Sequence, residues 1–158
     1  MKLKEFILRK SKLLILRTLK PYVDEIYLNT PKIYGSEKRV IISNLSKVSN
    51  TLFNTFSGNI TVEDYAFMGH NVSLLTGTHD IGLIGEERMS DIPTSGRDII
   101  VGEGVWIGSN SIILGPCRIG KNSVIAANSV VLKDVAEGVL VGGSPAREIK
   151  KIFPNDPS

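Results

Sequence analysis

The chain has 158 residues, a formal net charge of +3 and an apolar content of 42%. This length and composition indicate a single domain with a sizeable core, and the small net charge argues against a nucleic-acid-binding protein. The one cysteine, Cys117, cannot form an internal disulfide, so we expect it to pack in the core rather than to act as a catalytic thiol. A cytoplasmic location follows as the default.

Residues 1–20 are predicted to form a basic helix. They carry seven Lys or Arg and one Glu, a net charge of +6 that leaves −3 for the rest of the chain. Apolar residues lie largely along one side of this helix, namely Leu3, Phe6, Ile7, Leu13, Leu14 and Leu16. Pro21 is predicted to end it, because a proline inside a helix removes a backbone hydrogen bond and clashes with the preceding turn. Residues 1–39 are thus expected to be an amphipathic helix and a connector broken by Pro31 and Gly35.

This basic helix has two interpretations. It is too short and too charged to span a membrane, and no small-residue cleavage site marks it as a secretory signal. Its charge would allow residues 1–20 to make peripheral contact with an anionic surface, at the inner face of the membrane. The alternative, which we favour on general grounds, is that the helix caps the end of the following domain or packs in an oligomer.

A six-residue repeat dominates residues 99–135. Every sixth residue is aliphatic, in a row formed by Val101, Ile107, Ile113, Ile119, Ile125 and Val131. Four residues after each aliphatic comes a second row that is small or β-branched, formed by Val105, Ser111, Cys117, Ser123, Ser129 and Val135. The residue directly after the aliphatic is small in four cases, Gly102, Gly108, Gly120 and Ala126. Neither a helix, with its period of 3.6, nor a simple strand, with its period of 2, accounts for this spacing, so the repeat itself must set the fold.

The repeat predicts a parallel β-helix over residues 40–151, with three six-residue units in each coil. The aliphatics would point into a narrow core, and the small residues would occupy corners where the backbone turns sharply. An earlier stretch has the same register, at Val62, Met68 and Leu74. The next aliphatic of the later register, Val101, follows Leu74 by 27 residues, which is not a multiple of six. Residues 78–98 are therefore predicted to leave the coil as a loop.

His79 lies at the start of this predicted loop. Loops held by a rigid scaffold often carry function, and histidine is the side chain best suited to exchange protons near neutral pH. These two observations make His79 the candidate general base. Its ring could be oriented by a carboxylate, with Asp80, Glu86 and Glu87 nearby in the sequence, or by a backbone carbonyl.

Three segments carry a family resemblance: NVSLLTGTHD at 71–80, VWIGSN at 105–110 and VGGSPAREIKK at 141–151. They resemble the sugar O-acetyltransferase branch of the hexapeptide-repeat acyltransferases, which includes maltose and galactoside acetyltransferases. The resemblance covers roughly residues 50–151, and it implies an all-β, left-handed parallel β-helix, a homotrimer, and acetyl-CoA as co-substrate without a metal. It also implies that His79 deprotonates an acceptor hydroxyl, whose oxygen attacks the thioester directly without an acyl-enzyme.

The same resemblance implies roles for further residues. Those expected to bind acetyl-CoA are Trp106 near the thioester, Ser109 and Ala127 at the pantetheine arm, and Lys133 and Arg147 at the phosphates. Leu132 stands where many relatives have a threonine, which removes one polar contact to the co-substrate. Asn54 occupies the place of an acceptor-binding asparagine. Each has a purely structural alternative, since a lone tryptophan can be a buried packing residue and a basic residue an ordinary surface charge.

Other functions remain open on the sequence alone. Hexapeptide β-helices include zinc carbonic anhydrases, but a catalytic zinc needs three histidines and this chain has two, His70 and His79. His70 is better interpreted as a turn or subunit-interface residue. A non-enzymatic scaffold would have no need of the histidine-bearing loop. The expected acceptor is a saccharide, including one within a polysaccharide or glycolipid precursor, and the alternatives are an antibiotic or serine.

Overall fold

The computed structural model describes residues 3–152, and the chain divides into two units, residues 1–30 and 31–158. The first unit is the helix α1 (Leu3–Asn29), which contains Pro21 in its interior. The prediction that Pro21 ends the helix is therefore wrong. Proline removes only one backbone donor, and the Lys20–Asp24 ion pair, one turn apart, spans the proline and supports helical geometry there.

The apolar side chains of α1 are not confined to one side. Leu13, Leu14, Ile15 and Leu16 are consecutive and each is about half exposed or more, and successive helical residues are rotated by about 100°. These four side chains therefore surround the helix axis. The side chains of Leu3 and Phe6 lie outside the described part of the structure. Within residues 3–152, no helix has an apolar stretch long enough to cross a membrane.

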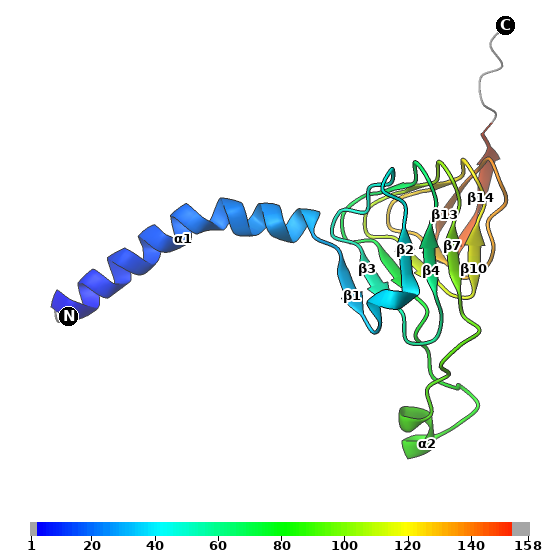
Figure 1. Ribbon diagram of the computed structural model, residues 1–158, viewed down its shortest axis with the longest axis horizontal. Coiled ribbons are helices and arrows are strands. Elements are labelled where there is room, and N and C mark those ends of the chain that lie inside the picture. Colours follow the sequence, from blue (N-terminus) through cyan, green and yellow to red (C-terminus); the bar gives the residue numbers. More distant parts are fainter. Residues whose placement is uncertain (1–2, 153–158) are drawn as a thin grey trace, which may run out of the picture. The chain divides into compact units, whose positions relative to one another are not determined.

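The second unit is a left-handed parallel β-helix with three sheets as its faces (Figure 1). The first sheet has the order β1 (Lys32–Tyr34), β3 (Leu52–Asn54), β6 (Ser73–Leu75), β9 (Ile112–Leu114) and β12 (Val130–Val131). The second has β2 (Val40–Ile42), β4 (Ile60–Val62), β7 (Ile99–Val101) and β10 (Cys117–Ile119). The third has β5 (Phe67–Met68), β8 (Trp106–Ile107), β11 (Val124–Ile125), β13 (Val139–Gly143) and β14 (Ala146–Lys151). The pairs are parallel except for the β13–β14 hairpin, so the predicted fold class is confirmed.

Both rows of the six-residue repeat lie in the core. The aliphatic row from Val101 to Val131 is at most 2% exposed, and the second row from Val105 to Val135 is at most 8% exposed. The small residues after the aliphatics allow the coils to stack closely. A Cβ on Gly108 would lie 2.5 Å from the backbone nitrogen of Ala127 in the next coil, which is closer than any real side chain approaches.

The β-helix begins earlier than the repeat indicates. The first strand, β1, pairs in register with β3, from Lys32 opposite Leu52 to Tyr34 opposite Asn54, so these residues are not part of a connector. In a regular coil, paired residues on the first sheet are 18 positions apart in the sequence, as Ile113 and Val131 are. The first coil contains 20 residues, from Lys32 to its partner Leu52, and the second contains 21, from Leu52 to its partner Ser73. The extra residues in these two coils blur the six-residue period, and β1 is the edge strand of the first sheet, with its three residues exposed.

The predicted loop is confirmed. It leaves the β-helix after β6 and returns at β7, and it contains the short helix α2 (Gly85–Ser90). Figure 1 shows α2, in green, standing outside the stack of coils. A short 3-10 helix (Glu37–Arg39) lies in the first coil, and the β13–β14 hairpin completes the third sheet at the other end of the stack.

Candidate active site

His79 lies just beyond the last residue of β6, where the chain leaves the coil. Its ring nitrogen Nδ1 is 2.7 Å from the backbone carbonyl oxygen of Arg88. A carbonyl oxygen can only accept a hydrogen bond, so Nδ1 carries the proton in the neutral ring and Nε2 keeps its lone pair. Of the two kinds of orienting group considered above, the structure contains the backbone carbonyl. Asp80 instead accepts a hydrogen bond from the backbone N–H of Gly82 at 2.7 Å.

The carbonyl of Arg88 is fixed by the side chain of the same residue. The guanidinium Nε donates to the carbonyl of Leu83, and Nη2 donates to the carbonyl of Ile81 at 3.2 Å. These two bonds connect α2 to residues 81–83, the part of the loop that precedes it. The planar guanidinium presents several donors in a fixed arrangement. Residues 79–88 are therefore held together by hydrogen bonds to their own backbone carbonyls.

Two further arginines anchor the ends of the loop to the coils. Arg97 Nε donates to the carbonyl of Thr76 at 2.9 Å. Arg39, from the first coil, donates through Nη1 to the carbonyl of Thr94 at 3.0 Å, and also to the carbonyls of residues 55 and 56. Each bond gives a backbone carbonyl a charged donor, and hydrogen bonds to charged groups are the stronger class. The loop is thus a folded part of the protein.

A cavity of about 260 Å³ lies beside His79. Its lining residues are Tyr34, Asn54, Phe56, Gly77, Thr78, His79 and Ile92. The structure therefore brings Asn54 and His79 to one pocket. Gly77 makes this possible, because a Cβ there would lie 2.6 Å from Asn54 Oδ1. Tyr34, Phe56 and Ile92 are not predictable from the repeat, because each falls in a stretch where the six-residue register is blurred or absent.

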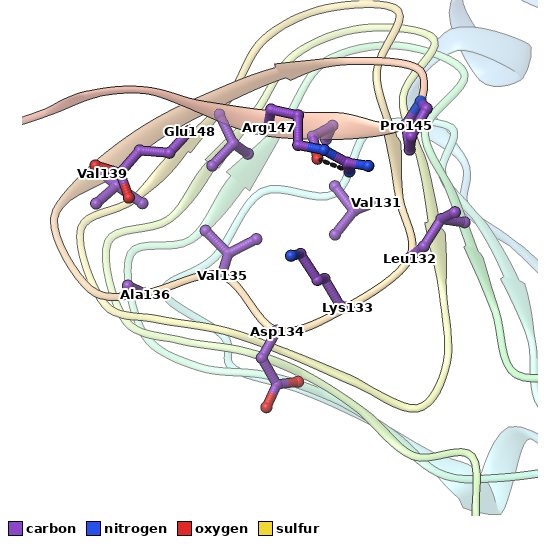
Figure 2. Close-up of a pocket in the computed structure, with 12 residues that line it drawn as sticks. Val131, Leu132, Lys133, Asp134, Val135, Ala136, Val139, Pro145, Arg147 and Glu148 are labelled. Atoms are coloured by element: carbon purple, nitrogen blue, oxygen red, sulfur yellow. Dashed lines mark hydrogen bonds between the residues drawn. The ribbon is translucent and has the colours of Figure 1, made fainter.

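Lys133 and Arg147 share a second cavity, of about 420 Å³, between the last coil and the β13–β14 hairpin (Figure 2). Lys133 projects into the hollow, with Arg147 across from it on β14, whereas the carboxylate of Asp134 points away. Arg147 Nη1 donates to the carbonyl of Ala146 at 2.9 Å. Both side chains are exposed, so their charges are available to an anionic ligand.

Trp106, Ser109 and Ala127 lie on or next to the third sheet. Trp106 is 48% exposed, and its ring stacks on Phe67 with a centroid distance of 5.8 Å. It is therefore not a buried packing residue. Ser109 Oγ accepts a hydrogen bond from the backbone N–H of His70, which lies in an exposed turn, at 3.1 Å. The carbonyl of Ser109 accepts from the N–H of residue 128 at 2.9 Å, which puts Ala127 in the adjacent coil.

Cys117 is buried, and its thiol donates to the carbonyl of Lys133 at 3.2 Å. Burial, with a smaller contribution from the nearby Asp134 carboxylate, raises the pKa of the thiol to about 12. The reactive form of cysteine is the thiolate, so Cys117 is a core residue, as predicted, and not a nucleophile. Among the residues that the structure describes, no three His, Cys, Asp or Glu side chains gather to form a metal site.

Comparisons with known proteins agree with this architecture. Residues 98–133 match the family described as bacterial transferase hexapeptide (six repeats). This chain therefore carries a hexapeptide repeat. A galactoside O-acetyltransferase of Lactococcus lactis is 35% identical to it over 97 residues, which are 61% of this chain and 45% of that protein. The hexapeptide-repeat chain spans about half the length of the curated relatives it matches.

Two solved structures resemble the hexapeptide-repeat chain. A maltose O-acetyltransferase of Clostridium difficile has a TM-score of 0.53 and 29% identity, over 79% of this chain and 68% of that one. A hexapeptide-repeat acetyltransferase of Vibrio cholerae, solved with acetyl-CoA, has a TM-score of 0.55 and 25% identity, over 87% of this chain and 79% of that one.

Proposed function

We propose that the hexapeptide-repeat protein is an O-acetyltransferase that moves an acetyl group from acetyl-CoA to a hydroxyl of a saccharide. The observation that carries this proposal is the hydrogen bond between His79 Nδ1 and the carbonyl of Arg88, which leaves Nε2 free as a base beside a pocket. The similarity to galactoside and maltose O-acetyltransferases supports the choice of reaction and of acceptor.

The reaction needs one base and good alignment. Nε2 of His79 takes the proton of the acceptor hydroxyl while the hydroxyl oxygen attacks the thioester carbonyl. The tetrahedral intermediate then collapses, the carbon–sulfur bond breaks, and the departing sulfur takes the proton from His79, giving the acetyl ester and free CoA. An alcohol is a poor nucleophile until it loses its proton, whereas a thioester is already activated, so positioning supplies much of the remaining rate.

The co-substrate site is assigned to five residues: Trp106, Ser109, Ala127, Lys133 and Arg147. Lys133 and Arg147 supply two exposed cationic groups in one cavity, which suits the phosphates of CoA. The half-exposed ring of Trp106 is available to an apolar part of the ligand. Leu132 is 53% exposed and offers no polar group, so the contact that a threonine makes in relatives is absent.

The positions of the two cavities fit a homotrimer in which each active site is formed by two neighbouring subunits. In one protomer the cavity beside His79 and the cavity with Lys133 and Arg147 have no residue in common. We infer that His79 of one subunit faces the acetyl-CoA residues of its neighbour, so that each site forms between two subunits. A cytoplasmic location, and membrane contact or end-capping by residues 1–20, remain predictions.

A thiol-release assay with acetyl-CoA tests the proposed function. Methyl glycosides, nucleotide sugars, serine and antibiotics serve as acceptors, and the proposal expects release of CoA with a saccharide. His79→Ala should lower kcat by a factor of about 10² to 10⁴, the usual contribution of a general base.

The matched control is His70→Ala, which removes the other histidine, lies in an exposed turn and should keep wild-type activity. Full acetyl transfer by His79→Ala would refute the mechanism, and release of CoA with serine or an antibiotic alone would refute the acceptor class.

A further inference from the structure

Two aromatic side chains form a wall of the cavity beside His79. Tyr34 and Phe56 have ring centroids 4.9 Å apart and are tilted by 57°. Tyr34 is 63% exposed and Phe56 is 41% exposed, so the pair belongs to the surface and not to the core. Their exposed ring surface faces a cavity that also contains Asn54 and Thr78. The lining of the pocket thus combines aromatic surface with a few polar groups.

The position of Tyr34 is fixed by the first coil. Tyr34 stands opposite Asn54 in the β1–β3 register. The next turn is held by Thr55 Oγ1, which accepts from the N–H of Ser36 at 2.8 Å and donates to the carbonyl of the same residue at 3.1 Å. Gly35 permits this contact because its φ is +115°, and a Cβ there would lie 2.5 Å from Thr55 Oγ1. The aromatic wall is therefore preorganised, which lowers the cost of binding.

We propose that Tyr34 and Phe56 bind one face of a pyranose ring in the acceptor and so select cyclic sugars over open-chain alcohols. This rests on the proposed function and names the part of the acceptor that the site recognises. A sugar ring presents C–H groups on its faces and hydroxyls around its edge, which matches a pocket with an aromatic wall and a few polar groups. Asn54 and Thr78 then meet edge hydroxyls, and one hydroxyl lies at His79.

The test compares methyl α-D-glucopyranoside with sorbitol, which also carries several hydroxyls but has no ring. Wild-type protein should have a lower KM for the glucoside than for sorbitol. Tyr34→Ala and Phe56→Ala should each raise the KM for the glucoside about tenfold, the upper range for an aromatic contact, and leave the KM for acetyl-CoA and for sorbitol unchanged. Tyr34→Phe keeps the ring and should recover the low KM.

Tyr65→Asn serves as the control. Tyr65 is 60% exposed like Tyr34, lies outside the cavity, and has a positive φ of 59° that asparagine tolerates. The inference is overturned if the alanine variants leave the glucoside KM unchanged, if they raise the KM for glucoside and sorbitol equally, or if wild-type protein uses the two acceptors equally well. No release of CoA by wild-type protein with any acceptor would instead overturn the proposed function.

Discussion

At the scale of single residues, the two ring nitrogens of His79 have different surroundings. Nδ1 is hydrogen-bonded to a backbone carbonyl, whereas Nε2 has the lone pair that a base requires. The sequence identified the histidine because it stands where a regular repeat gives way to a loop. Its partner could not be found in this way, because every residue has a backbone carbonyl and no side-chain pattern marks the one that is used.

Cys117 permits a prediction about pH and stability. Its pKa is raised in the folded protein to about 12 from an ordinary value of 9.0. Below pH 9 the thiol is protonated in both the folded and the unfolded states, so it adds no pH dependence. As the pH rises from 9 toward 12 the unfolded state loses the proton first, and the free energy of unfolding falls.

Denaturant unfolding at several pH values checks this expectation. The difference in unfolding free energy between wild-type protein and Cys117→Ala should shrink as the pH rises above 9. Iodoacetamide should also modify the folded wild-type protein slowly at pH 8 and the unfolded protein rapidly, because the folded protein holds little thiolate. Rapid modification of the folded protein would contradict burial of the thiol.

At the scale of elements, the loop between β6 and β7 was predictable and its interior was not. Any loop that leaves the coil breaks the six-residue register, so the sequence indicates where the loop is but not how it folds. The fold of the loop depends instead on guanidinium–carbonyl bonds, such as the bond from Arg39 to Thr94, 55 residues away. The same limit applies to β1, whose coil of 20 residues breaks the six-residue period. It also applies to Pro21, which lies inside α1 and is spanned by the Lys20–Asp24 ion pair.

Arg88 is predicted to be a positioning residue for His79. Replacing Arg88 with Ala removes the bonds to Ile81 and Leu83 and frees the carbonyl that holds Nδ1. Kcat should fall by about 10²-fold, since a displacement of about 1 Å can cost that much. The KM for acetyl-CoA should change much less than kcat, because the bonds that are lost lie within the loop and involve none of the residues assigned to acetyl-CoA.

Three measurements separate positioning from a general loss of stability. The pH profile of kcat/KM should change in Arg88→Ala, since the hydrogen bond that orients the base is weakened, and added guanidinium at low concentration should restore part of kcat. Arg88→Lys should fall between wild-type protein and Arg88→Ala because it offers a point charge in place of the planar fork. Glu87→Gln, on the same short helix, is the control. An unchanged kcat in Arg88→Ala would refute the assignment.

At the scale of the whole molecule, the repeat determines the fold because each six-residue unit places one side chain in the core, as the buried row from Val101 to Val131 shows. The site is a different case. The proposed site takes His79 from the loop, Asn54 and Tyr34 from the two coils before the loop, and Lys133 from the last coil. These residues share no local pattern, so their assignment needed either a family resemblance or the three-dimensional structure.

Subunit mixing tests whether each site is shared between neighbours. His79→Ala removes the base and leaves the acetyl-CoA residues intact. A double variant, Lys133→Glu with Arg147→Glu, weakens the acetyl-CoA site and leaves the base intact. In a trimer whose sites each take His79 from one subunit and the cationic pair from the next, co-expression of the two variants in equal amounts should make one site in four complete. Activity per protomer should therefore recover to about one quarter of the wild-type value.

Measurement of kcat/KM at low acetyl-CoA, with native mass spectrometry to confirm mixed trimers, gives the answer. Sites contained within one subunit would give no recovery, because every subunit then carries one defect in its own site. Activity equal to the mean of the two parent variants, in trimers shown to be mixed, would therefore refute the shared site and would require His79 and the cationic pair to act within a single chain. Recovery to about one quarter requires that Lys133 and Arg147 serve the His79 of a neighbouring subunit.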